Sequence, residues 1–182
     1  MSGSDKGKGG GGVRNAHKNP ALSKAERLRK FVERRREKYD SYDETKYNKI
    51  YFDEKTGGYV VEEKARYEQG QKSKNAKEVY DKEQKMSVVL AKHGKRVEHL
   101  SDASGGHDIR VNGISADLKK TKGANNLANY AKKATRKQGA KLVVFQIDNL
   151  SHAVHFELNK LSDKGIHGWY FITGREENLI WF

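Results

Sequence analysis

The sequence contains no cysteine and a single proline among its 182 residues. The absence of cysteine excludes a disulfide framework and any chemistry that needs a thiolate. No apolar run approaches the roughly 18 residues that span a bilayer, and residues 1–20 lack the apolar stretch of a secretory signal. These absences predict a protein with no transmembrane segment and no export signal, whose site of action is cytoplasmic.

Basic residues are what the chain has in excess. Lys and Arg total 37 against 24 Asp and Glu, which gives a formal net charge of +13. Such a field attracts polyanions, chiefly nucleic acid, or else an anionic membrane surface. The charge therefore predicts a class of partner, whereas an activity must be sought in the placement of particular residues.

Composition divides the chain into three segments. Residues 1–20 are rich in glycine and lysine and are expected to be disordered. Residues 21–72 predict a basic helix and then a hairpin that serves as an arm or linker. Ser23 and Glu26 have the spacing of a capping box at the start of that helix, whose basic face is either solvated or docks on nucleic acid or protein. Residues 73–182 predict a compact domain.

The compact domain shows a regular alternation of patterns. Hydrophobic periodicity predicts the order helix, three strands, helix, strand, helix and two strands. The run KLVVFQI is nearly all apolar, as expected of a strand that is covered on both faces. The pattern predicts an α/β fold with a mixed central sheet flanked by helices.

The stretch HDIRVNGISADLKK, residues 107–120, predicts a hairpin. Asn-Gly between alternating residues favours a two-residue type I′ turn, so counting outward from Asn112 and Gly113 sets Asp108 opposite Asp117. Side chains alternate between the faces of a strand. The expected apolar face holds Ile109, Val111, Ile114, Ala116 and Leu118, and the other face holds Asp108, Arg110, Ser115, Asp117 and Lys119.

The two opposed aspartates suggest a bound cation. Like charges directly opposite one another destabilise a sheet, and hard cations such as Mg²⁺ are held by one or two carboxylates together with substrate phosphate. Asp108 and Asp117 therefore predict a divalent metal site, with Mg²⁺ favoured and Mn²⁺ or Zn²⁺ as alternatives. Lys119 projects on the same face, where it can position water or neutralise charge on a reacting phosphate. An exposed polar face with two aspartates and no ligand is the other interpretation.

A helical Glu83, then Asp108, then Asp117-x-Lys119 across a hairpin resembles the PD-(D/E)xK nuclease superfamily. The segments EQKMSVVLAKHGKRVEHL, HDIRVNGISADLKKTKGANN and KKATRKQGAKLVVFQI resemble the C-terminal tRNA-nuclease toxin domains of contact-dependent growth inhibition proteins. Similar domains are also found on phage minor head proteins and mobile-element proteins. The resemblance covers roughly residues 73–182, and His107 stands where the superfamily name has proline.

The resemblance implies a restriction-endonuclease-like core and a metal-dependent phosphodiesterase. Glu83, Asp108 and Asp117 would hold the metal, and Lys119 would complete the catalytic set. The favoured substrate would be tRNA, and toxins of this kind have a cognate immunity protein as partner. The sequence alone leaves the choice between RNA and DNA open.

Basic residues flank the expected site. Those on the hairpin and just after it, and those on the following helix, would track a phosphate backbone, although an ordinary solvated face is the other interpretation. Asn125 and Asn126 would either cap that helix or contact phosphate. The expected nucleic-acid contacts are Arg110, Lys120, Lys122, Lys132, Lys133 and Arg136.

Two other functions fit the same sequence. A metal-independent ribonuclease would use a histidine as general base, and His93, His99 and His107 are the candidates. His152 and His155 are spaced for metal ligation on a helix but lack a third ligand at a convincing spacing. A non-enzymatic nucleic-acid binder, such as a structural protein of a phage or mobile element, is the alternative to an enzyme.

Overall fold

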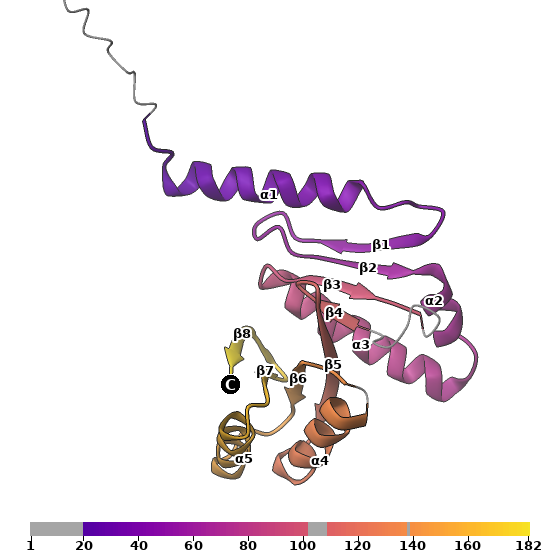
Figure 1. Cartoon of the computed structure of the whole chain (residues 1–182), viewed down its shortest axis with the longest axis vertical. Coiled ribbons are helices and arrows are strands. Elements are labelled where there is room, and N and C mark those ends of the chain that lie inside the picture. The colour runs from indigo at the N-terminus through magenta and orange to yellow at the C-terminus, as the bar shows by residue number, and fades with distance from the viewer. Residues whose placement is uncertain (1–19, 102–108, 138) are drawn as a thin grey trace, which may run out of the picture.

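The computed structural model describes residues 20–101, 109–137 and 139–182. Within these residues, eight strands form one sheet, and their spatial order is their order along the chain (Figure 1). The strands are β1 (Tyr47–Phe52), β2 (Tyr59–Glu63), β3 (Arg96–His99), β4 (Ile109–Val111), β5 (Ile114–Thr121), β6 (Leu142–Ile147), β7 (His167–Ile172) and β8 (Arg175–Trp181). The α-helices are α1 (Lys24–Asp40), α2 (Lys64–Gly70), α3 (Lys74–Lys92), α4 (Leu127–Lys132) and α5 (His152–Asp163).

The sheet is mixed, as the sequence predicted. β5, β6 and β7 run parallel to one another, whereas β3, β4 and β5 pair antiparallel and β8 runs antiparallel to β7. From α3 onward the elements follow the expected order of helix, three strands, helical segment, strand, helix and two strands. The expected α/β fold with a mixed sheet between helices is confirmed.

The hairpin of β1 and β2 is part of this sheet. β1 pairs antiparallel with β2, and β2 pairs parallel with β3 from Tyr59↔Arg96 to Glu62↔His99. The sheet therefore continues across the boundary expected at residue 73, and the hairpin is its edge instead of an arm or linker. The chain passes from β2 to α3 through α2, a short helix that the sequence patterns did not predict.

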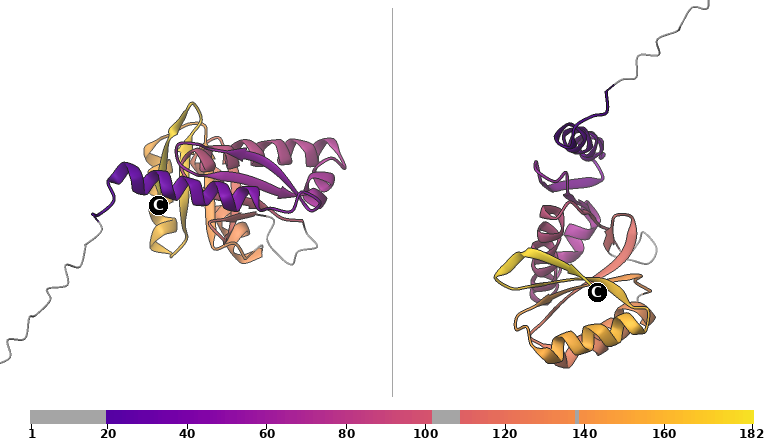
Figure 2. Two further views of the ribbon diagram at one scale, coloured as in Figure 1. Left: turned by 90° about the horizontal axis from the view of Figure 1, so that it is seen from above. Right: turned by 90° about the vertical axis from the view of Figure 1, so that its left-hand side faces the viewer.

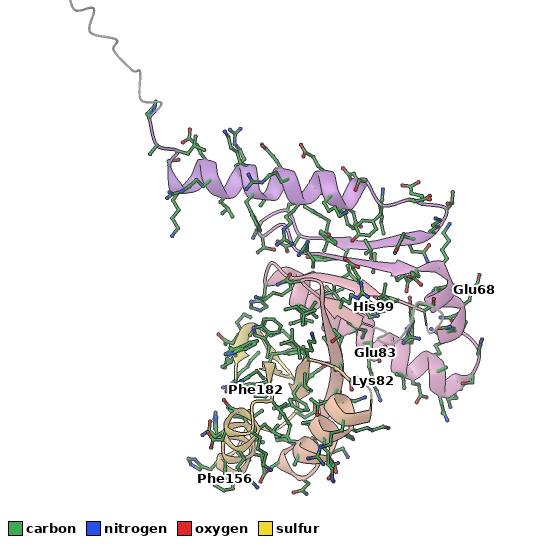
Figure 3. The ribbon with its side chains drawn as sticks, viewed as in Figure 1. Glu68, Lys82, Glu83, His99, Phe156 and Phe182 are labelled. Atoms are coloured by element: carbon green, nitrogen blue, oxygen red, sulfur yellow. The ribbon has the colours of Figure 1, made fainter. Side chains whose placement is uncertain are left out.

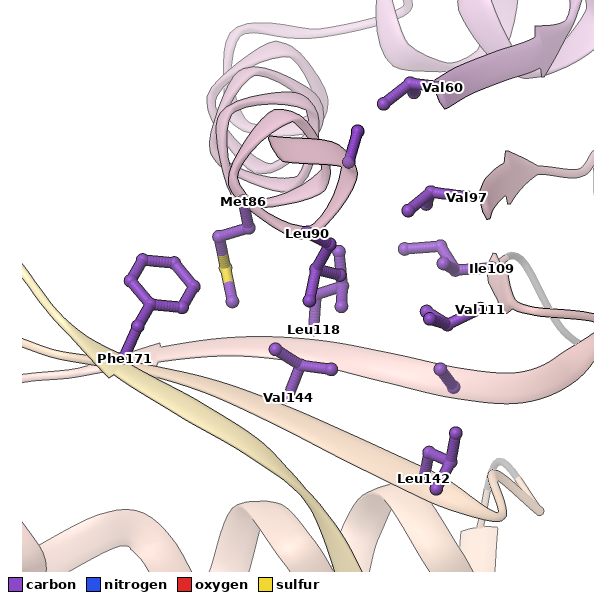
Figure 4. Close-up of a cluster of buried hydrophobic side chains, with 12 residues drawn as sticks. Val60, Met86, Leu90, Val97, Ile109, Val111, Leu118, Leu142, Val144 and Phe171 are labelled. Atoms are coloured by element: carbon purple, nitrogen blue, oxygen red, sulfur yellow. The ribbon is translucent and has the colours of Figure 1, made fainter. Parts of the chain in front are cut away.

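Helices cover both faces of the sheet (Figure 2). On one face, Met86 and Leu90 of α3 pack against residues of β3 to β7 in a core that includes Leu118 (Figure 4). On the other face, α4 and α5 pack against Val143 and Phe145 of β6. β6 is thus buried on both sides, as its apolar sequence predicted.

Helix α1 begins with the capping box that the sequence predicted, and its C-terminal end packs against the sheet. Ser23 and Glu26 form the capping box, with each side chain bonded to the other's backbone N–H. Near the end of α1, Tyr39 is buried against Tyr59 and Val61 of β2. No helix in the described part of the chain combines the length and the apolar character that a membrane crossing requires.

The segment before β6 is helical but not one regular helix. A 3₁₀ turn (Ala124–Asn126) leads into α4, and a π-helical turn (Lys133–Lys137) follows it. The sequence predicted one helix here, whereas the structure has three short helical pieces of different type. Leu127, Ala131 and Ala134 are nevertheless buried, as predicted. π-helical turns are rare and frequently lie at functional sites.

The hairpin of β4 and β5 has the predicted register. Ile109 pairs with Ala116 and Val111 with Ile114. Asn112 and Gly113 both have positive φ, 51° and 81°, which is the conformation of a type I′ turn. The apolar face is buried except at its rim, where Ile114 is 44% exposed.

Candidate metal and nucleic-acid site

Asp117 and Lys119 lie two residues apart on the polar face of β5. Their side chains are largely buried, and Lys119 Nζ lies 3.1 Å from Asp117 Oδ2. Oδ2 is buried, and the contact with Lys119 is the one that the described structure gives it. A buried carboxylate oxygen of this kind is a natural ligand for a cation.

Glu83 reaches the same place from α3. Together with Lys119 it lines a cavity of about 190 Å³. The cavity lies along the part of β5 that follows Ala116, the residue paired with Ile109 at the start of β4. The remaining lining residues are Val79, Lys82, Met86, Leu118, Lys120, Tyr130 and Lys133. Figure 3 labels Glu83 and Lys82 on α3, below His99 in this view. Glu83 thus lines the cavity beside Lys119, close enough to Asp117 for the charge of Asp117 to raise its pKa.

Arg66 of α2 holds Glu83. Its Nη2 donates a hydrogen bond of 2.6 Å to Glu83 Oε2, and both side chains are largely buried. Sequence reasoning missed Arg66 because α2 itself was not expected. A run of seven residues is too short for hydrophobic periodicity to reveal.

Burial raises the pKa of both carboxyl groups. For Glu83, desolvation is the largest cause; Arg66 and Lys119 oppose it, and the charge of Asp117 adds to it. For Asp117, desolvation again raises the pKa, while Lys119 and Lys133 lower it. The charge of Asp117 therefore disfavours the ionised form of Glu83, and a cation bound by both carboxylates would relieve that repulsion.

A buried histidine supports the backbone beneath Glu83. Ser87 of α3 donates a hydrogen bond of 2.8 Å to the carbonyl oxygen of Glu83, and its Oγ lies 2.7 Å from His99 Nε2. Since the Ser87 hydroxyl proton is used, the contact requires His99 to donate from Nε2. Burial, helped by the charge of Arg66, lowers the pKa of His99 to about 3, so His99 is a neutral structural group.

The third expected metal ligand, Asp108, lies outside the described residues, as does His107. Among the residues that the structure describes, no three His, Cys, Asp or Glu side chains gather as a metal-binding group. Glu83 and Asp117 supply carboxylate oxygens, the donors that Mg²⁺ and Mn²⁺ prefer. The residues present therefore fit a hard cation, with the position of Asp108 left as a prediction.

Most of the expected nucleic-acid contacts lie around this cavity. Lys120 and Lys133 line it, and Lys120 and Lys122 line a larger neighbouring cavity. Lys132, Lys133 and Arg136 line a third hollow on the outer side of the helical segment. The three hollows share lining residues, Lys120 between the first two and Lys133 between the first and the third, so these cationic side chains are grouped near Glu83.

Arg110 is the expected contact that the structure does not bring to the cavity. It is exposed on β4, in register with Glu98 of β3 and Ser115 of β5. Its charge acts on Tyr47 of β1. Arg110 thus belongs to the β1–β4 half of the sheet, away from Lys120 and Lys133.

The remaining histidines do not form a second centre. His152 and His155 are exposed on α5, and neither belongs to a metal-binding group in the described structure. His93 Nε2 lies 2.8 Å from the carbonyl oxygen of Glu176. With His99 buried and neutral, the described histidines offer no general base at the cavity.

Comparisons with known proteins give one distant likeness. No protein-family model matches the sequence, and no curated protein matches it. Among solved structures, a chain of the CdiA-CT/CdiI toxin and immunity complex from Burkholderia pseudomallei is 17% identical, with a TM-score of 0.49 over 62% of this chain and 89% of that chain. A likeness at that identity and TM-score does not indicate the activity of this protein. Membership of the PD-(D/E)xK superfamily stays a prediction that depends on the residues of the site.

Proposed function

We propose that the domain containing β5 and α3 is a metal-dependent nuclease that hydrolyses phosphodiester bonds, with RNA favoured over DNA. The observation that carries the proposal is the cavity itself. Glu83, a buried acid with a raised pKa, lines it beside Lys119, and lysines form the rest of its charged lining. Asp117, a second buried acid with a raised pKa, forms an ion pair with Lys119. Perturbed acids in a cleft are typical of functional sites, and the surrounding lysines suit a polyanionic substrate.

Asp117 Oδ2 and Glu83 Oε1, the oxygen not bonded to Arg66, are the described atoms that would hold the cation. Asp108 is the expected third ligand. A bound Mg²⁺, or Mn²⁺ or Zn²⁺ in its place, would polarise the scissile phosphate and make a coordinated water more acidic.

Lys119 would act on the reacting phosphate. In hydrolysis the oxygen of water bonds to phosphorus, the bond from phosphorus to one sugar oxygen breaks, and that oxygen leaves with a proton. The ammonium of Lys119, beside Asp117, can orient the water and neutralise charge that develops on the phosphate. Lys120 and Lys133 would hold the flanking phosphates.

The resemblance to tRNA-nuclease toxin domains makes tRNA the first substrate to test and an immunity protein the first partner to seek. Action on tRNA would take place in the cytoplasm.

The test is incubation of the full chain with total tRNA or duplex DNA, in Mg²⁺, Mn²⁺, Zn²⁺ or EDTA. Cleavage should need a divalent cation, and Asp117→Asn and Lys119→Met should each lower its rate by at least about 100-fold. The matched controls are Asp163→Asn and Lys164→Met at the exposed end of α5, which should cut like the parent chain.

A non-enzymatic nucleic-acid binder is the second candidate. The ion pair between Lys119 and Asp117 favours it, because the carboxylate already has a cationic partner. If RNA and DNA stay intact with all three cations while the protein binds them, the binder interpretation holds and the nuclease proposal fails.

A further inference from the structure

A larger cavity adjoins the candidate site. It has a volume of about 570 Å³ and shares Lys82, Lys120 and Tyr130 with the smaller cavity that contains Glu83 and Lys119. Its other lining residues come from the end of β5, the turn into α4, and the residue after β6: Thr121, Lys122, Gly123, Ala124, Asn125, Asn126 and Asp148. Ligand cavities for small molecules span about 300 to 1,000 Å³, so this one has room for a nucleotide.

The lining combines an aromatic ring with two amides. Tyr130 is half-buried, packed against the core formed by α4, α5 and β6. Asn126 is at the N-cap of α4, but its side chain makes no capping hydrogen bond. Asn125 and Asn126 both line the cavity, and the Asn126 amide is not engaged in capping the helix. A ring for stacking beside amides that donate and accept is the equipment that proteins use to bind an unstacked base.

The charges of the cavity suit the phosphates of the same nucleotide. Lys82, Lys120 and Lys122 contribute three cations. Asp148, the acid among the described lining residues, accepts a hydrogen bond of 2.6 Å from the Thr173 hydroxyl and lies 3.7 Å from Lys120 Nζ. Its charge is thereby partly neutralised, and the cavity keeps a net positive potential.

We propose that this cavity binds one unpaired nucleotide adjacent to the scissile phosphate, with its base on Tyr130 and its edge toward Asn125 and Asn126. The location of the scissile phosphate rests on the proposed nuclease function; the binding of an unpaired base does not. A base inside a duplex is paired and stacked, so only a single strand, a loop or a flipped nucleotide can enter. The cavity thus selects unpaired segments of its substrate.

The test measures binding without cleavage. A short single-stranded oligonucleotide carrying one 2-aminopurine is titrated with the full chain in EDTA, and its fluorescence reports stacking of that base. Stacking of one base on an aromatic ring is worth about 1–3 kcal/mol, so Tyr130→Leu should weaken binding about 5- to 100-fold. Phe156→Leu on the exposed face of α5 is the matched control and should bind like the parent chain.

A second substitution, in the oligonucleotide, makes the test specific. An abasic site scanned along the strand should weaken binding to the parent chain at one position and leave binding to Tyr130→Leu unchanged there. Thermal unfolding monitored by circular dichroism shows that both variants are folded. RNA and DNA versions of the strand identify the preferred sugar.

The outcomes separate the two proposals. If duplex and single strand bind with equal affinity, and neither Tyr130→Leu nor an abasic site at any position changes that affinity, the cavity does not bind an unpaired nucleotide. That conclusion holds whether or not the protein cleaves nucleic acid. If binding depends on Tyr130 and one base but no cation supports cleavage, the nuclease proposal fails and the nucleotide cavity stands.

Discussion

Arg66 and Glu83 form an ion pair of 2.6 Å between α2 and α3, with both side chains largely buried. A buried charge without a partner is strongly destabilising. Arg66 therefore favours the ionised form of Glu83 at a position where burial alone raises the pKa of that carboxyl. The pair also ties the candidate site to α2, an element that precedes the compact domain expected from the sequence.

Replacing Arg66 should destabilise the fold by leaving Glu83 unpaired. We expect Arg66→Leu to lower the free energy of unfolding at neutral pH by roughly 3 kcal/mol, measured by urea denaturation. The double variant Arg66→Leu/Glu83→Leu should recover most of this loss, because no buried charge remains. Arg29→Leu, which breaks an exposed pair with Glu33, should change stability by less than about 1 kcal/mol. Equal losses in Arg66→Leu and Arg29→Leu would contradict the burial of the pair.

The raised pKa values of Glu83 and Asp117 fix the sign of a pH dependence. Between the pKa of an unfolded carboxyl, about 4, and the raised value in the fold, only the folded protein carries the proton. Stability should therefore be highest below that interval and fall as the pH rises through it. Asp117→Asn removes one of the two groups and should make the fall shallower.

A divalent cation should stabilise the fold at the upper end of this pH interval, where Glu83 and Asp117 are ionised, because it binds the ionised carboxylates. Melting temperatures measured from about pH 4 to 8, with and without millimolar Mg²⁺, test both effects. Mg²⁺ should raise the melting temperature of the parent chain and of Asp163→Asn, and leave Asp117→Asn unchanged. A stabilisation by Mg²⁺ that survives Asp117→Asn would place the cation elsewhere.

His99 should give a pH dependence of the opposite sign. Its pKa falls to about 3 in the fold, whereas an unfolded histidine titrates near 6.5. Its contribution to stability is therefore present above about pH 6.5 and is lost as the pH falls toward 3, by up to about 2 kcal/mol at pH 5. Urea denaturation of His99→Phe across this range should show a weaker loss than the parent chain. His152→Gln, on the exposed start of α5, should show the full loss.

The hairpin could be predicted because its determinants are local. The Asn112-Gly113 turn and the alternation around it fix the register that places Asp117 and Lys119 on one face. The alternation of side chains along β3 also indicates that His99 is buried. Val97 and His99 occupy the buried positions of β3, between the less buried Arg96 and Glu98, so the pattern marks His99 as a core residue.

The parts that could not be predicted depend on contacts between distant residues. Arg66 and Glu83 are 17 positions apart, and their meeting depends on how α2 packs against α3. The parallel pairing of β2 with β3 likewise joins segments on either side of two helices. No pattern within one segment records such a contact. The extent of the sheet and the residue that holds Glu83 are therefore known only from the structure.

The cationic surface on the helical segment should determine the salt dependence of binding. Lys132 and Arg136 are exposed beside the candidate site, and each phosphate contact on a single strand contributes about 0.7 to the slope of log affinity against log salt. We expect Lys132→Gln/Arg136→Gln to reduce that slope by about 1.4, measured by fluorescence anisotropy of a single-stranded oligonucleotide in EDTA. Lys160→Gln/Lys164→Gln, on α5 and at its C-cap, removes the same net charge at positions that line none of these three cavities, so its slope should match that of the parent chain. If both double variants lower the slope equally, net charge and not the placement of these side chains drives binding, and the nucleic-acid surface assigned to the helical segment is wrong.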